Sequence, residues 1–74
     1  MMANKSVSWS IDAGLYAAAR SGAKNDEDFR LLARLREGVG TDNDFMRAML
    51  LVAAAGDVDT AESMLGMLFQ EAGR

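Results

Sequence analysis

Four glycines divide this 74-residue chain into segments of nearly equal length. Gly22, Gly38, Gly56 and Gly73 are 16, 18 and 17 residues apart, and each follows a run of residues with helical periodicity. A glycine just past the end of a helix can adopt the left-handed backbone conformation that caps the helix at little steric cost. The spacing therefore predicts four short helices joined by tight turns.

Periodicity and capping residues together predict an all-α fold, in which four short helices form two helical hairpins over residues 10–21, 25–37, 42–55 and 58–72. Ser8 or Ser10 is the expected N-cap of the first helix. Asn25 is the expected N-cap of the second helix, since three acidic residues follow it where the helix dipole favours negative charge. Thr41 and Asp44 resemble a capping box at the start of the third helix.

The third and fourth helices are far more apolar than the first two. From Phe45 to Ala55 only Arg47 is polar, which predicts a helix that is buried nearly all round. The segment 64–69 is apolar throughout apart from Gly66. Glycine in a helix interior costs about 1 kcal/mol relative to alanine. Gly66 therefore indicates that another backbone passes close to that position.

The N-terminal segment has a different period. From Ser6 to Ile11 serines alternate with apolar residues, which is typical of a half-buried strand. We expect residues 1–9 to form an extended arm whose Trp9 packs over a single helical domain of residues 10–74. The alternative is a strand that pairs with a symmetry-related copy or with the sheet edge of a target.

Composition limits both stability and chemistry. A domain of this size buries only about 60% of the surface that its unfolded chain exposes, and without Cys or His it has neither a disulfide nor a zinc site to compensate. Lack of cysteine, of a membrane-length apolar run and of a signal-like N-terminus predicts a soluble, cytoplasmic protein. Without His, Cys or a phosphate-binding loop, neither an enzyme nor a cofactor is expected.

Two Asp-x-Asp pairs, Asp42/Asp44 and Asp57/Asp59, raise the question of a cation site. A calcium loop requires glycine at its sixth position and glutamate at its twelfth, and counting from Asp57 these places hold Glu62 and Leu68. Both pairs lie at expected helix starts, where capping explains them. We therefore expect no metal site.

The two halves of the chain are weakly similar to each other. An offset of 34 residues places Gly22 over Gly56 and Leu31 over Leu65, and this is the period of a helix-turn-helix repeat.

Residues 45–73 resemble a degenerate tetratricopeptide repeat. The positions that carry the resemblance are Phe45, the turn Gly56-Asp57, Ala61 and Leu65. The chain departs from the repeat pattern at Met49, Leu68 and Gly73. The resemblance implies that a peptide or a partner helix is bound in a groove, and it implies no catalysis.

The apolar surplus of the third and fourth helices predicts an interface with another protein, of which a homodimer is the simplest form. The expected patch consists of Phe45, Met46, Met49, Met64, Leu68 and Phe69, rimmed by Asp42, Asp44, Asp59 and Glu62. Such a patch prefers a partner surface that is apolar at its centre and basic at its edge. The rival interpretation is that these residues form an internal core.

The sequence therefore favours a non-enzymatic protein–protein interaction module. It would be an adaptor, a chaperone-like subunit, or an inhibitor of a larger machine, such as phages and mobile elements encode. The alternative is a small helical DNA-binding regulator that uses Arg30, Arg34 and Arg36 of the second helix. Acidic residues lie within pairing range of these arginines, and the apolar third and acidic fourth helices do not resemble a recognition helix. Nucleic acid is therefore not the expected partner.

Overall fold

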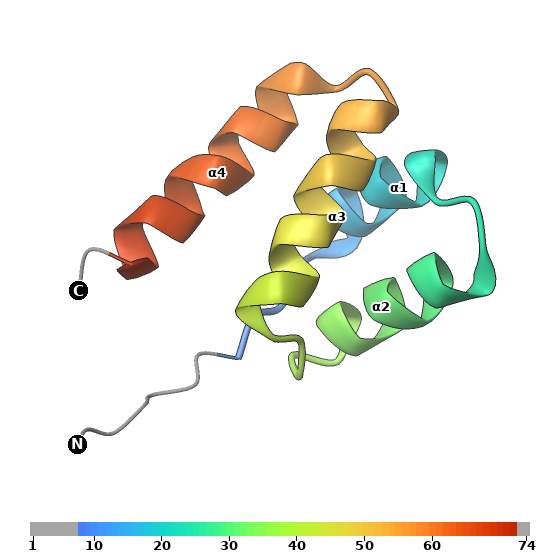
Figure 1. Ribbon diagram of the computed structural model, residues 1–74, viewed down its shortest axis with the longest axis horizontal. Coiled ribbons are helices and arrows are strands. Elements are labelled where there is room, and N and C mark those ends of the chain that lie inside the picture. Colours follow the sequence, from blue (N-terminus) through green and yellow to red (C-terminus); the bar gives the residue numbers. More distant parts are fainter. Residues whose placement is uncertain (1–7, 73–74) are drawn as a thin grey trace.

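The computed structural model describes residues 8–72 of the protein. This part of the chain forms four helices (Figure 1), which are α1 (Ala13–Gly22), α2 (Asp26–Arg36), α3 (Asp42–Ala54) and α4 (Val58–Ala72). The all-α fold expected from the glycine spacing is confirmed. Residues 1–7 of the expected arm, and Gly73, lie outside the described residues.

Helix α3 is the centre of the domain. It packs against α1, α2 and α4, whereas α4 packs almost entirely on α3. Figure 1 shows α4 on one side of α3, with α1 and α2 on the other. The largest fully buried side chains come from α2, α3 and α4, and they are Leu32, Leu35, Phe45, Val52 and Met64.

Local capping explains where two of the helices begin. The Asn25 side chain accepts the backbone N–H of Asp28 at 3.0 Å. At the start of α3, the Thr41 hydroxyl accepts the backbone N–H of Asp44, and the Asp44 carboxylate accepts that of Thr41, each at 3.1 Å. The expected N-cap at Asn25 and the expected capping box at Thr41 are confirmed.

The expected start of the first helix is wrong. Helix α1 begins at Ala13, and its N-cap is Asp12, whose carboxylate accepts the backbone N–H of Leu15 at 2.8 Å. The residues before it stay extended because their backbone groups have distant partners. Trp9 donates its backbone N–H to the carbonyl of Gly40 at 2.9 Å, and Ile11 donates to that of Leu35 at 3.1 Å.

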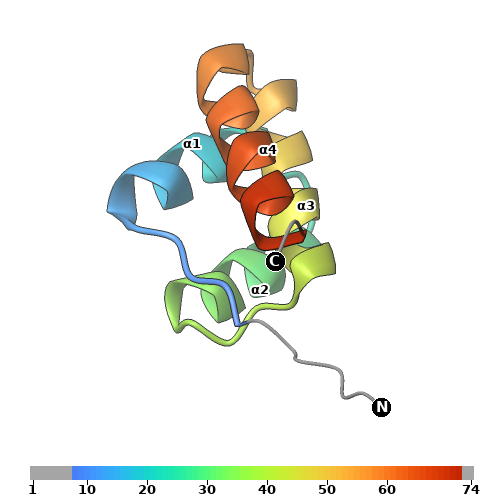
Figure 2. The ribbon, with the colours of Figure 1, turned by 90° about the vertical axis from the view of Figure 1, so that its left-hand side faces the viewer.

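Trp9 anchors this extended segment to the bundle. Its indole stacks on the ring of Phe45, with 4.1 Å between ring centroids and 19° between ring planes. Its Nε1–H donates to the carboxylate of Asp42. Figure 2 shows the segment running beside the loop between α2 and α3. The expected packing of Trp9 over the helices is confirmed, and strand pairing with another molecule stays a prediction.

The glycines have different roles from one another. Gly38 and Gly56 have φ angles of 78° and 95°, as expected for helix C-termini. A Cβ at Gly66 would meet nothing within 4 Å, so the expectation of a close backbone there is wrong. Gly22 is the last residue of α1 and has no positive φ, so the expected left-handed cap there is wrong. The close approach is at Gly22, where a Cβ would overlap the backbone carbonyl of Leu51 on α3. Gly22 therefore allows α1 and α3 to touch.

Two glycine-to-alanine substitutions test this assignment. Gly22→Ala forces backbone apart at a buried contact and should lower the free energy of unfolding by about 1–3 kcal/mol. Gly66→Ala should raise it by about 0.5–1 kcal/mol, because alanine is the better helix former and has open space there. Urea unfolding followed by the fluorescence of Trp9, the only tryptophan, measures both changes. Equal effects of the two substitutions would contradict the assignment.

Candidate functional site

Exposed apolar side chains concentrate on the last two helices. Of the eight large apolar side chains that are exposed within residues 8–72, two lie outside these helices, at Phe29 and Val39. The other six are Met46, Leu50, Val58, Leu65, Met67 and Phe69. Concentrated exposure of this kind marks interaction surfaces more often than scattered exposure does.

The structure corrects the patch predicted from the sequence. Phe45 and Met64 are fully buried, so their assignment to a binding surface is wrong. Met49 and Leu68 are half-buried against the core. Met46 is exposed, and Phe69 is the most exposed of the large apolar side chains, at 67%. The expectation that α3 is buried nearly all round is also wrong, because full burial is confined to the stripe of Phe45, Ala48 and Val52, while Met46 and Leu50 are exposed.

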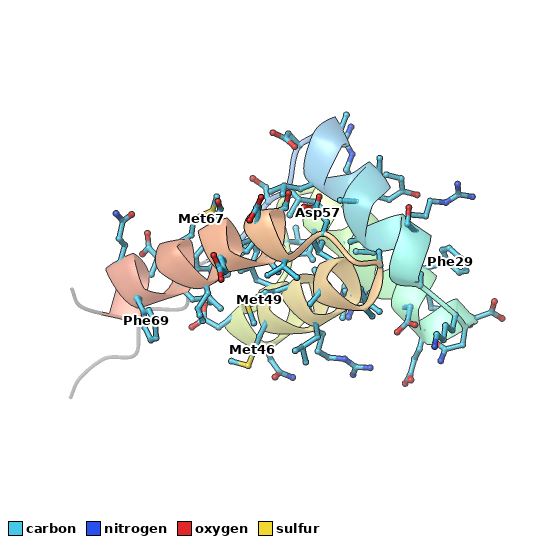
Figure 3. All side chains as sticks on the ribbon, turned by 90° about the horizontal axis from the view of Figure 1, so that it is seen from above. Phe29, Met46, Met49, Asp57, Met67 and Phe69 are labelled. Atoms are coloured by element: carbon cyan, nitrogen blue, oxygen red, sulfur yellow. The ribbon has the colours of Figure 1, made fainter. Side chains whose placement is uncertain are left out.

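Four of the remaining apolar residues form what we call the seam, which consists of Met46 and Met49 on α3 with Leu65 and Phe69 on α4. Each pair is three or four residues apart and so lies on one face of its helix. In Figure 3, Met46 and Phe69 point to the same side of the α3–α4 pair, while Met67 points to the opposite side. The seam is thus an apolar strip where two packed helices meet.

The predicted patch missed two exposed apolar residues of α4, which are Val58 at its start and Leu65. Val58, Glu62, Leu65 and Phe69 recur at intervals of four, three and four residues, so they share one flank of α4. This spacing is visible in the sequence. Periodicity does not say which of the apolar faces of α4 another helix covers. In the structure α4 packs on α3 through the face with Ala61, Met64 and Leu68, and the flank with Leu65 stays exposed.

The acidic residues of the predicted rim have two kinds of role. Asp42 accepts the indole N–H of Trp9, and Asp44 is buried at the start of α3. Both therefore have a structural role, although Asp42 is also exposed to solvent. Asp59 and Glu62 are exposed on α4. They remain in a position to meet a partner.

Asp44 joins α2 to α3. Arg34 contacts both of its carboxylate oxygens, with Nη2 at 3.1 Å and Nε at 3.3 Å. Hydrogen bonding from Arg34 is the main reason why the pKa of Asp44 lies below its ordinary value of 3.8. The Thr41 backbone N–H lowers the pKa in the same direction, while partial burial opposes the change.

The arginines of the alternative nucleic-acid site are largely occupied. Besides the pairing of Arg34 with Asp44, Arg36 donates to the backbone carbonyl of Ile11 at 3.1 Å. The Arg36 guanidinium also lies 5.8 Å from the centre of the Tyr16 ring. Arg30 is exposed on α2. Two of the three arginines thus hold neighbouring segments of the fold together.

The second Asp-x-Asp pair also has a local explanation. One carboxylate oxygen of Asp57 accepts the backbone N–H of Thr60 at 3.2 Å, and the other accepts its hydroxyl at 2.7 Å. Within residues 8–72 no three His, Cys, Asp or Glu side chains gather closely enough to hold a metal ion. None of the helices in that range is long and apolar enough to cross a membrane.

No protein-family model, curated protein or solved structure matches this chain. The tetratricopeptide resemblance of residues 45–73 therefore stays a prediction. The packed pair α3–α4 is the part of the structure to which it refers.

Acidification tests the pair formed by Arg34 and Asp44. Because the pKa of Asp44 is lowered in the folded protein, its ionised form stabilises the fold at neutral pH, and this contribution is lost as the pH falls below about 4. Asp44→Asn should therefore have a lower free energy of unfolding than the wild type at pH 7, and this difference, the gap, should narrow on acidification. Urea titrations at several pH values measure this. Glu62→Gln is the control, and a gap independent of pH would contradict the role of the charge.

Proposed function

We propose that this protein is a non-enzymatic protein–protein interaction module that binds its partner through the seam and the adjoining flank of α4. The observation that carries the proposal is the exposure of Met46, Leu65 and Phe69 on the packed pair α3–α4. A domain of 74 residues has little apolar surface to spare, since burial is its main source of stability. Leaving these side chains in water favours their burial by a partner.

The chemistry of the seam suits an adaptable contact. Phe69 supplies a large apolar ring, and aromatic side chains often dominate the energy of an interface. Met46 and Met49 have flexible thioether side chains that can follow the shape of different surfaces. Full burial of each such side chain contributes about 1.5–3 kcal/mol, part of which offsets the cost of association. We expect moderate affinity and a reversible complex.

The biological uses that fit this contact are those of an adaptor, a chaperone-like subunit, or an inhibitor that covers the working surface of a larger machine. Each of them places one apolar surface of a small acidic domain against a larger protein. We place this activity in the cytoplasm. The seam acts by covering a client surface, and no catalytic step is part of the proposal.

A homodimer through the same surface is the weaker form of this proposal. Between Ala48 and Ala72 the chain has no Lys or Arg, and it has acidic residues at Asp57, Asp59, Glu62 and Glu71. A two-fold interface would bring these like charges towards each other, which opposes association.

Light scattering over a range of concentrations tests self-association. We expect a mass near the 8.0 kDa of one chain at low salt and low concentration, rising towards about 16 kDa when added salt screens the acidic rims. Phe69→Asp should hold the protein at the lower mass. A dimer that is equally stable at all salt concentrations, or unaffected by Phe69→Asp, would exclude the seam as its interface.

Site-specific photocrosslinking in the cells that produce the protein tests the proposed function itself. A photoreactive phenylalanine analogue at position 69 should form protein adducts, because Phe69 lies in the seam. The same analogue at position 39 is the matched control, since Val39 is 57% exposed but lies outside α3 and α4. Equal protein adducts at both positions would contradict the proposal, and nucleic-acid adducts at Arg30 would favour the DNA-binding alternative.

A further inference from the structure

We infer that the occupant of the seam is an amphipathic helix of another protein, with basic residues along its margins. This inference rests on the proposed function and names the kind of partner. Three features of the described residues support it: the length and residue spacing of the apolar strip, the absence of an open backbone edge beside it, and the sign of the charges around it.

The strip has the length and spacing of a helix-binding surface. From Val58 to Phe69 it follows α4 for twelve residues, whose eleven steps of 1.5 Å span about 16 Å. Exposed apolar side chains recur along it at helical intervals, and Met46 and Met49 form its other side. An amphipathic helix presents apolar anchors at the same intervals, so about three turns of such a helix match the strip.

A strand would find nothing to pair with at this place. Both sides of the seam are α-helices, whose backbone N–H and C=O groups are bonded within each helix. Addition of a strand requires unpaired backbone groups along an edge. Side-chain packing is therefore the main contact that the seam offers, and helices associate by such packing.

The charges beside the seam favour a partner helix with basic residues on either side of its apolar stripe. Glu62 lies on the same flank of α4 as Leu65 and Phe69, and Asp42 lies one turn before Met46 on α3. Arg47 is the only basic residue of α3 or α4 within the described residues, and its position is about 100° around α3 from that of Met46. A partner helix with Lys or Arg beside its apolar stripe meets charges of opposite sign, while an acidic helix is repelled.

The charges beside the seam also favour a basic helix of another protein over a second copy of this chain. A second copy would present its own α3–α4 surface, which brings Glu62 and Asp59 and has no Lys or Arg between Ala48 and Ala72. A basic amphipathic helix supplies the charges that this surface lacks. Nucleic acid is excluded as the occupant of the seam because an apolar strip with acidic margins repels phosphate.

Two designed peptides test the inference. Both are 18-residue helices with the same leucine stripe, one with lysine on either side of the stripe and one with glutamate. Fluorescence anisotropy of the labelled peptides against the full chain measures their binding. We expect the lysine peptide to bind about tenfold more tightly than the glutamate peptide at low salt, and we expect added salt to reduce the difference.

Variants of the protein locate the binding site. Leu65→Asp should abolish binding of the lysine peptide, whereas Val39→Asp, at an exposed apolar position outside α3 and α4, should leave binding unchanged. Glu62→Lys should weaken binding of the lysine peptide and strengthen binding of the glutamate peptide. Fluorescence of Trp9, which stacks on Phe45 in the core, confirms that each variant is folded.

The outcomes distinguish this inference from the proposed function. Equal binding of the two peptides overturns the preference for basic margins and leaves an apolar docking surface. Absence of binding by either peptide, with protein crosslinks at position 69 intact, overturns the helical occupant alone. Absence of seam-specific crosslinks overturns the proposed function, and binding of the lysine peptide that survives Leu65→Asp places its site elsewhere.

Discussion

The structure depends on the contact that α3 makes with every other helix. Its stripe of Phe45, Ala48 and Val52 is fully buried, and α1, α2 and α4 all reach it from different directions. The chain has no Cys or His and so no disulfide or zinc site, and a domain of this size then depends on the packing of its helices. Gly22 allows α1 to approach α3 closely, and the Trp9 ring stacks on that of Phe45. The arrangement uses one face of α3 completely and leaves Met46 and Leu50 in water.

The candidate site follows from the same constraint. Helices α1 and α2 pack on each other as well as on α3, whereas α4 has α3 as its main neighbour. Ala61 and Met64 fill that contact, and the flank with Leu65 and Phe69 is left without a covering helix in the described part of the chain. Exposure of the seam is therefore a consequence of topology, since no further helix of residues 8–72 reaches it.

Local signals in the sequence predicted the helices well, and long-range contacts account for the errors. Asn25 and Thr41 were identifiable as caps because capping acts over three residues. The start of α1 was not, because the bonds from Trp9 and Ile11 to Gly40 and Leu35 keep those residues extended. Phe45 and Met64 share the apolar character of the exposed residues, and only the packing of α4 on α3 decides which of them are inside. The charge preference that we propose for the seam could be anticipated, because the sequence has no Lys or Arg between Ala48 and Gly73.

Dependence of α4 on a single neighbour also bears on how the domain opens. Regions with few buried contacts detach at lower free energy than the rest of a protein, so α4 is the part whose amides should exchange with solvent through local opening. Trp9, Gly22 and the pair Arg34–Asp44 connect the other three helices to one another or to the N-terminal segment. A partner that covers the flank of α4 would supply the second neighbour that this helix lacks. Binding would then raise the free energy of local opening of α4, and a tighter complex would make this opening rarer.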